Sequence, residues 1–109
     1  MVRRGRLHLA DEQSFFVTTT VVNFTKMFIN DIYCDILIRN IKHYQKKYKF
    51  TILSYMIMPS HFHWIVQVTP ILGTISDIMG DIKKYSARDI MDKIGEYDPN
   101  LIRTFVFRG

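Results

Sequence analysis

The segment 55–66 constrains the fold most, and it reads Tyr-Met-Ile-Met-Pro-Ser-His-Phe-His-Trp-Ile-Val. Two histidines, His61 and His63, flank one phenylalanine in an apolar run that follows a proline. Successive side chains of a strand point to opposite faces, so both imidazoles would share one face while Phe62 and Trp64 enter the other layer. Two imidazoles on one face form half of a metal site. The alternative is an ordinary amphipathic strand whose exposed face carries histidine.

Hydrophobic periodicity predicts two helices. The apolar residues of the first recur at three- and four-residue steps over 29–48: Ile29, Ile32, Tyr33, Ile36, Leu37, Ile41, Tyr44 and Tyr48. Thr74 and Asp77 form a capping signal for the second helix, which Gly95 is expected to end. Its predicted core face consists of Ile75, Ile78, Met79, Ile82 and Ile90.

Four strands are predicted around these helices. Residues 15–24 are dense in Phe, Val and Thr, which favours a first strand. Residues 49–58 and 61–68 are predicted to form an antiparallel hairpin around Pro59-Ser60, and 101–107 to supply a short final strand. The order βαββαβ predicts an α+β fold, a ferredoxin-like or RNA-recognition-like sandwich with an antiparallel sheet and two helices on one face. We expect one domain over residues 1–109.

Composition narrows the class of protein. The 109 residues contain 15 Lys and Arg against 10 Asp and Glu, a net charge of +5 that suits a phosphate-backbone binder. A hydrophobic fraction of 48% argues for a filled core or an oligomer interface and against disorder. The single cysteine, Cys34, cannot form an internal disulfide. No run reaches the roughly 18 apolar residues of a membrane span, so we expect a cytoplasmic protein that does not contact a membrane.

Three stretches resemble the single-tyrosine transposases of the HUH superfamily, which include the REP-associated tyrosine transposases. Residues 54–66 resemble the family's metal-binding strand, roughly A-Y-V-I-M-P-N-H-x-H-L-L, although Ser60 and Trp64 stand where the family usually has Asn and Leu. Residues 14–20 resemble its opening strand, and 78–86 resemble the helix that follows the histidines. The resemblance extends from about residue 14 to residue 88.

The resemblance implies a metal-dependent DNA transposase. His61 and His63 would bind a divalent ion, Mg or Mn, and a tyrosine would attack a DNA phosphate to give a 5′-phosphotyrosine and a free 3′-OH. In the family this tyrosine and the third metal ligand lie on a later helix, near a segment resembling Y-I-H-x-N-P-V-K. We therefore expect both to lie beyond Gly109 and the chain to be truncated. The implied partners are single-stranded or hairpin DNA and a second copy in a homodimer.

One tyrosine within the chain is a candidate nucleophile. Tyr85 follows Lys83 and Lys84 and precedes Arg88, cations that suit a phosphate and a phenolate. A tyrosine three residues after Ile82 is more often a core residue with its hydroxyl at the rim. Tyr97, expected in a turn, is a weaker candidate.

Other cations are candidate DNA contacts. Lys83, Lys84 and Arg88 form one cluster, and Arg3, Arg4 and Arg6 form an N-terminal arm that would follow phosphates or enter a groove. The arm is equally consistent with a frayed terminus. Residues 42–49 mix lysines with aromatic rings that would stack on bases, or the lysines simply complement the dipole at a helix C-terminus.

Three functions remain open at this point. The first is DNA nicking and strand transfer, and the second is a catalytically inactive DNA-binding remnant of such a transposase. The third is an unrelated zinc hydrolase or structural zinc site, for which further ligands at suggestive spacings are absent from the sequence. His8 and His43 lie far from the pair along the chain.

Overall fold

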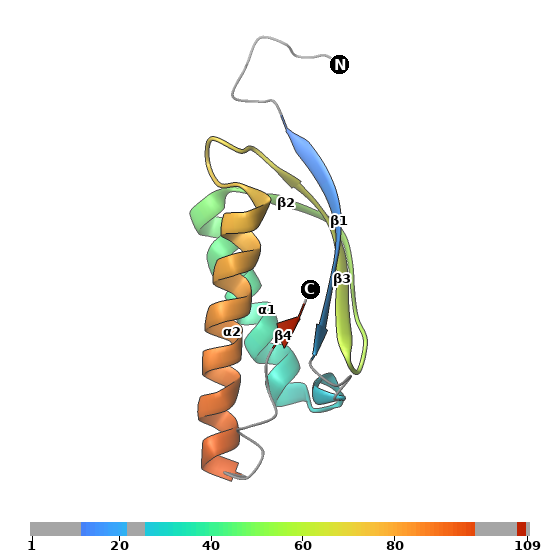
Figure 1. Ribbon diagram of the computed structural model, residues 1–109, viewed down its shortest axis with the longest axis vertical. Coiled ribbons are helices and arrows are strands. Elements are labelled where there is room, and N and C mark those ends of the chain that lie inside the picture. The colour runs from blue at the N-terminus through green and yellow to red at the C-terminus, as the bar shows by residue number, and fades with distance from the viewer. Residues whose placement is uncertain (1–11, 22–25, 98–106, 109) are drawn as a thin grey trace.

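The computed structural model describes residues 12–21, 26–97 and 107–108 (Figure 1). Its elements in chain order are β1 (Gln13–Val21), the 3-10 turn η3 (Met27–Ile29), α1 (Asp31–Tyr48), β2 (Thr51–Ile57), β3 (His61–Val68), α2 (Ile75–Tyr97) and β4 (Phe107–Arg108). The α+β class and the βαββαβ order are therefore confirmed. Most of the predicted last strand, 101–106, lies outside the described residues.

The strands form one antiparallel sheet in the order β2-β3-β1-β4. Both helices lie on the same side of this sheet (Figure 1). The order places β3 in the interior of the sheet, between β1 and β2. The other face of the sheet, which the helices do not cover, is called the open face below.

The core lies between the sheet and the helices. On β3 the alternate residues Phe62, Trp64, Val66 and Val68 are buried against the helices, as the pattern predicted. The helices meet them with Ile36, Leu37, Ile41 and Tyr44 from α1 and with Ile78, Ile82, Ile90 and Ile94 from α2. Each fully buried large apolar side chain contributes about 1.5–3 kcal/mol. This burial fixes which face of β3 is left for the histidines.

The start of α1 differs from the prediction. The helix begins at Asp31, and the Asn30 side chain accepts a hydrogen bond from the Ile32 amide at 2.9 Å. Ile29 belongs to the preceding η3 turn and is exposed, and Ile32 is exposed as well. Their assignment to the apolar face was wrong, and the buried residues just before α1 are Met27 and Phe28 on η3.

A buried amide joins the two helices. Asn40 lies on the buried face of α1, where its Nδ2 donates to the Ile36 carbonyl at 3.0 Å and to the Asp89 carboxylate at 3.1 Å. Buried polar groups are costly unless they are paired in this way. The periodicity of apolar residues gave no sign of this contact.

The ends of both helices also depart from the prediction. Lys49, expected in a strand, takes the left-handed conformation with φ 59° as the C-cap of α1, and its amide donates to the Gln45 carbonyl at 2.9 Å. The next strand therefore begins at Thr51. Gly95 does not end α2, which continues to Tyr97, because one interior glycine costs a helix only about 1 kcal/mol.

The hairpin between β2 and β3 turns at Pro59 and Ser60, as predicted, with Met58 N donating to the His61 carbonyl at 2.8 Å. The two loop carbonyls accept from Phe28 and Val21, each at 2.9 Å. These bonds tie the loop to η3 and to the end of β1. The start of β3 is thereby held in place.

β2 contains an irregularity that the sequence pattern did not indicate. Ile52 pairs with Val66 and Ser54 with Ile65, so Leu53 is an extra residue in the strand. A bulge of this kind shifts every later side chain to the other face.

Within the described residues, neither helix has the length and hydropathy together that crossing a membrane requires.

Candidate metal centre

His61 and His63 lie side by side on the open face of β3. They alternate with the buried Phe62 and Trp64, so both imidazoles are half-buried on the side away from the helices. Their ring centroids are 4.8 Å apart with an interplanar angle of 81°. The shared face predicted from the spacing is therefore present, and these two residues are called the histidine pair below.

Hydroxyl groups hold both rings through the same ring atom. Thr18 Oγ1 on β1 lies 2.9 Å from His63 Nδ1, and Ser60 Oγ in the hairpin loop lies 3.0 Å from His61 Nδ1. In the tautomer that carries the proton on Nδ1, each ring donates to its hydroxyl and presents the Nε2 lone pair. Among the described residues, neither Nε2 atom takes part in a hydrogen bond.

This arrangement suits metal ligation. Metal-binding histidines commonly donate their second ring N–H to an oxygen, which fixes the tautomer and the ring orientation. No group of three His, Cys, Asp or Glu side chains within the described ranges is placed to hold an ion. Among the described residues, the histidine pair therefore offers two ligands to an ion.

Apolar side chains surround His63 on the open face. Phe16 of β1, Met56 of β2 and Ile65 of β3 are exposed by 71%, 58% and 38%. Phe16 lies parallel to the His63 ring, with an interplanar angle of 3° and centroids 6.0 Å apart. With Ser54 they line a shallow hollow of about 300 Å³.

The sequence reasoning missed this surrounding set. Thr18 and Phe16 pair with His63 and Ile65 across the β1–β3 ladder, and Met56 pairs with His63 from β2. Thr18 and Phe16 are two residues apart in the first strand, so they share a face. Their register against the histidines is a property of strand pairing that no local pattern contains.

Tyr85 lies elsewhere, in the helix layer. Its ring is partly buried and stacks on Tyr44 at a centroid distance of 5.9 Å. Lys84 Nζ and Arg88 Cζ lie 5.1 and 4.7 Å from its centroid. Because the helices cover the face of the sheet opposite the histidine pair, the structure does not bring Tyr85 to it (Figure 1).

Two neighbouring tyrosines of the helix layer, Tyr44 and Tyr48, have raised pKa values. Burial, and then the Asp81 carboxylate, raise the pKa of Tyr44 above its ordinary value. The Tyr48 hydroxyl donates to Asp81, and this bond, followed by burial, raises the pKa of Tyr48. A raised pKa leaves less phenolate near neutral pH.

The predicted DNA contacts lie either away from the histidine pair or outside the described residues. Lys83, Lys84 and Arg88 are on α2, with Lys84 and Arg88 over the Tyr85 ring. The arm formed by Arg3, Arg4 and Arg6 falls outside the described residues, as does the side chain of Tyr97. Tyr97 is the last residue of α2, although it was expected in a turn.

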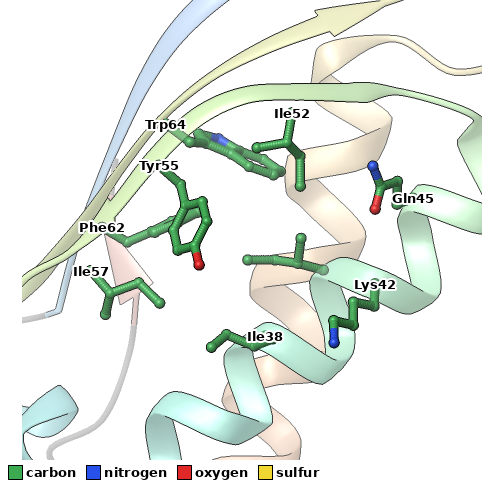
Figure 2. A pocket seen from close by; sticks show the side chains of 9 residues that line it. Ile38, Lys42, Gln45, Ile52, Tyr55, Ile57, Phe62 and Trp64 are labelled. Carbon is green, nitrogen blue, oxygen red and sulfur yellow. The ribbon is translucent and has the colours of Figure 1, made fainter.

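A second hollow, which the sequence did not indicate, lies on the helix side of the sheet (Figure 2). Ile52, Tyr55 and Ile57 of β2 approach α1 there, and Lys42 stands on the opposite wall. Its volume is about 130 Å³. Since it opens between α1 and β2, it is separated from the histidine pair by the sheet.

Comparison with known proteins agrees with this fold. The family described as "Transposase IS200 like" matches residues 14–108. A solved structure from Deinococcus radiodurans R1, described as that of a candidate transposase, is similar with a TM-score of 0.69 and 14% identity, covering 98% of this chain and 83% of that one. No curated protein matches the sequence. Because the family match spans nearly the whole chain, including both histidines, the protein belongs to the IS200-like transposase family.

Proposed function

We propose that this transposase performs single-strand nicking and strand transfer on DNA, with His61 and His63 as ligands of a divalent metal, Mg or Mn. The observation that supports this most is the geometry of the histidine pair, in which both Nδ1 atoms lie within hydrogen-bond distance of hydroxyls and, among the described residues, neither Nε2 atom takes part in a hydrogen bond. An ion bound there would act as a Lewis acid that withdraws charge from a DNA phosphate.

The residues of the chain divide this work. Neutral imidazoles supply the ligands, and Thr18 and Ser60 orient them so that little reorganisation is needed on binding. The strands Gln13–Val21, Thr51–Ile57 and His61–Val68 contain no acidic residue, so the described open face does not repel phosphate. The net charge of +5 favours the approach of DNA.

The nucleophile is proposed to be a tyrosine whose hydroxyl attacks phosphorus, forming a 5′-phosphotyrosine and releasing a 3′-OH. Tyr33, Tyr44, Tyr48 and Tyr85 lie in the helix layer, and Tyr55 lines the helix-side hollow. We therefore propose that the attacking tyrosine comes from outside the described side chains, from this chain or from a second copy.

The alternative is a catalytically inactive remnant that binds DNA without cutting it. The observation that favours it is that the described tyrosines other than Tyr55 lie on the helices, and that the Tyr55 side chain points into the helix-side hollow (Figure 2). The two proposals differ only in whether a covalent adduct forms.

Metal titration tests the site common to both proposals. Calorimetry with MnCl₂ should show binding to the wild type and none to His61→Ala/His63→Ala. His43→Ala is the matched control, because His43 is an exposed histidine on α1. Equal affinity in the double variant and the wild type would remove the site.

A denaturing gel decides between the transferase and the remnant. The chain is incubated with labelled hairpin and single-stranded oligonucleotides and MnCl₂, and a protein–DNA band is sought. We place the attacking tyrosine outside the described side chains, so a band should persist in Tyr85→Phe, whereas binding without any band would support the remnant. A band that Tyr85→Phe abolishes would make Tyr85 the nucleophile and refute this placement.

The cluster of Lys83, Lys84 and Arg88 is proposed to hold DNA phosphates at a second position on the helix layer. Each phosphate contact adds about −0.7 to the log-log salt slope of single-strand binding. Neutralising all three should flatten the slope, and an unchanged slope would argue against their role.

We also propose that two chains associate. β2 is an edge strand of the described sheet, with Leu53 and Tyr55 exposed along it. An exposed apolar edge is a common place for strands of two copies to meet. Sedimentation velocity measures this directly.

A further inference from the structure

We propose that Phe16, with Met56 and Ile65 beside it, forms a stacking platform for one nucleobase of single-stranded DNA next to the histidine pair. This inference rests on the proposed function, because it assumes a DNA phosphate at His61 and His63. It adds a binding position for the base of the nucleotide, which the metal site does not contact.

The first reason is the exposure and the type of side chain. Phe16 lies between the polar residues Ser14 and Thr18 on its face of β1 and pairs with Ile65 of β3, and 71% of its surface is exposed. Burying such a side chain would contribute about 1.5–3 kcal/mol. Single exposed apolar residues are ordinary, but here three of them line one hollow.

The second reason is the position relative to the proposed phosphate. The Phe16 centroid lies 6.0 Å from that of His63, and the two rings are nearly parallel. Successive phosphates of one DNA strand are about 3.4 Å apart along a duplex axis and further apart in an extended strand. A base adjacent to a phosphate at the histidine pair therefore falls within reach of the Phe16 ring.

The third reason is electrostatic. The three strands that carry this face contain neither Asp nor Glu, so the backbone of a nucleic acid meets no like charge there. A flat ring on an open sheet can stack on any base, since every base has a π-face. A nucleotide fits both features, because its base can stack on the Phe16 ring while its phosphate lies at the histidine pair.

The test uses four variants of the full chain. Phe16→Ala removes the ring, Phe16→Leu keeps apolar volume without a plane, and Phe16→Trp keeps a plane. Ile71→Ala is the matched control, because Ile71 is exposed by 70% in the β3–α2 loop, away from this face. Circular dichroism checks that each variant folds. Substitutions at Phe16 should not disturb folding, because this side chain is exposed.

Fluorescence anisotropy with MnCl₂ then measures binding of two probes. One is a mixed-sequence single-stranded oligonucleotide, and the other is the same backbone without bases. For the first probe, Phe16→Ala should weaken binding about 5- to 150-fold, with Phe16→Leu similar. Phe16→Trp and Ile71→Ala should resemble the wild type. For the abasic probe, Phe16→Ala should change nothing.

The outcomes separate this inference from the proposed function. If the wild type binds DNA and Phe16→Ala binds it equally well, the platform is refuted while the proposed function stands. If the wild type binds no DNA, the proposed function fails and the platform with it. If Phe16→Ala converts a dimer to a monomer in sedimentation velocity without changing DNA affinity, a second copy of the chain covers this face. The platform is then refuted as well.

Discussion

The hydroxyl of Thr18 provides the sharpest test of how the histidine pair is built. Thr18→Val keeps the shape of the side chain and removes the group that lies 2.9 Å from His63 Nδ1. Without it, the ring loses its fixed tautomer and orientation. Loss of such a supporting bond typically weakens metal binding 10- to 100-fold, which corresponds to about 1.4–2.7 kcal/mol.

A neighbouring residue supplies the matched control. Thr20 lies two residues along the same strand and pairs with His61, yet within the described residues it makes no hydrogen bond to that ring. Thr20→Val is therefore the same substitution on the same face without the loss of an anchor. Both changes should alter stability by less than about 0.5 kcal/mol, since they are surface substitutions to a good strand former.

The assay is isothermal titration with MnCl₂ on the wild type and both valine variants. We expect the affinity order wild type, then Thr20→Val at nearly the same value, then Thr18→Val well below. If Thr18→Val and Thr20→Val bind manganese equally well, the anchoring role of Thr18 is wrong.

Two further predictions concern stability and thiol chemistry. A Cβ on Gly73 would lie 2.8 Å from Cγ and 3.0 Å from Cβ of Tyr48, so Gly73→Ala should lower the free energy of unfolding in urea by about 1–3 kcal/mol. Gly80→Ala, where the added Cβ meets nothing within 4 Å, should raise it by about 0.5–1 kcal/mol, and equal stability of the two variants would contradict this packing. Burial, and then the Asp35 carboxylate, raise the pKa of Cys34, so less thiolate is present at mildly alkaline pH and Ellman's reagent should react slowly. Asp35→Asn should speed that reaction, and an unchanged rate would exclude the carboxylate as a cause.

Several features were determined by the sequence itself because their causes are local. The alternation around Phe62 assigned the histidines to one face, and apolar steps of three and four residues placed both helices. The capping signal at Thr74 is present as predicted, with Asp77 N donating to Thr74 Oγ1 at 3.1 Å and Thr74 N donating to Asp77 Oδ2 at 3.3 Å. Such signals act within a few residues, so the chain displays them before it folds.

Other features were decided only by the tertiary structure, because they depend on segments distant in the chain. The register of β1 against β3 brought Thr18 to His63 across 45 positions, and it set Phe16 beside the same ring. The bulge at Leu53 turned Met56 toward the histidines. Packing of α2 against α1 placed Tyr85 in the helix layer, away from the open face. A strand's own sequence specifies its alternation but not its partner, so these contacts emerge only when the sheet and the helices assemble.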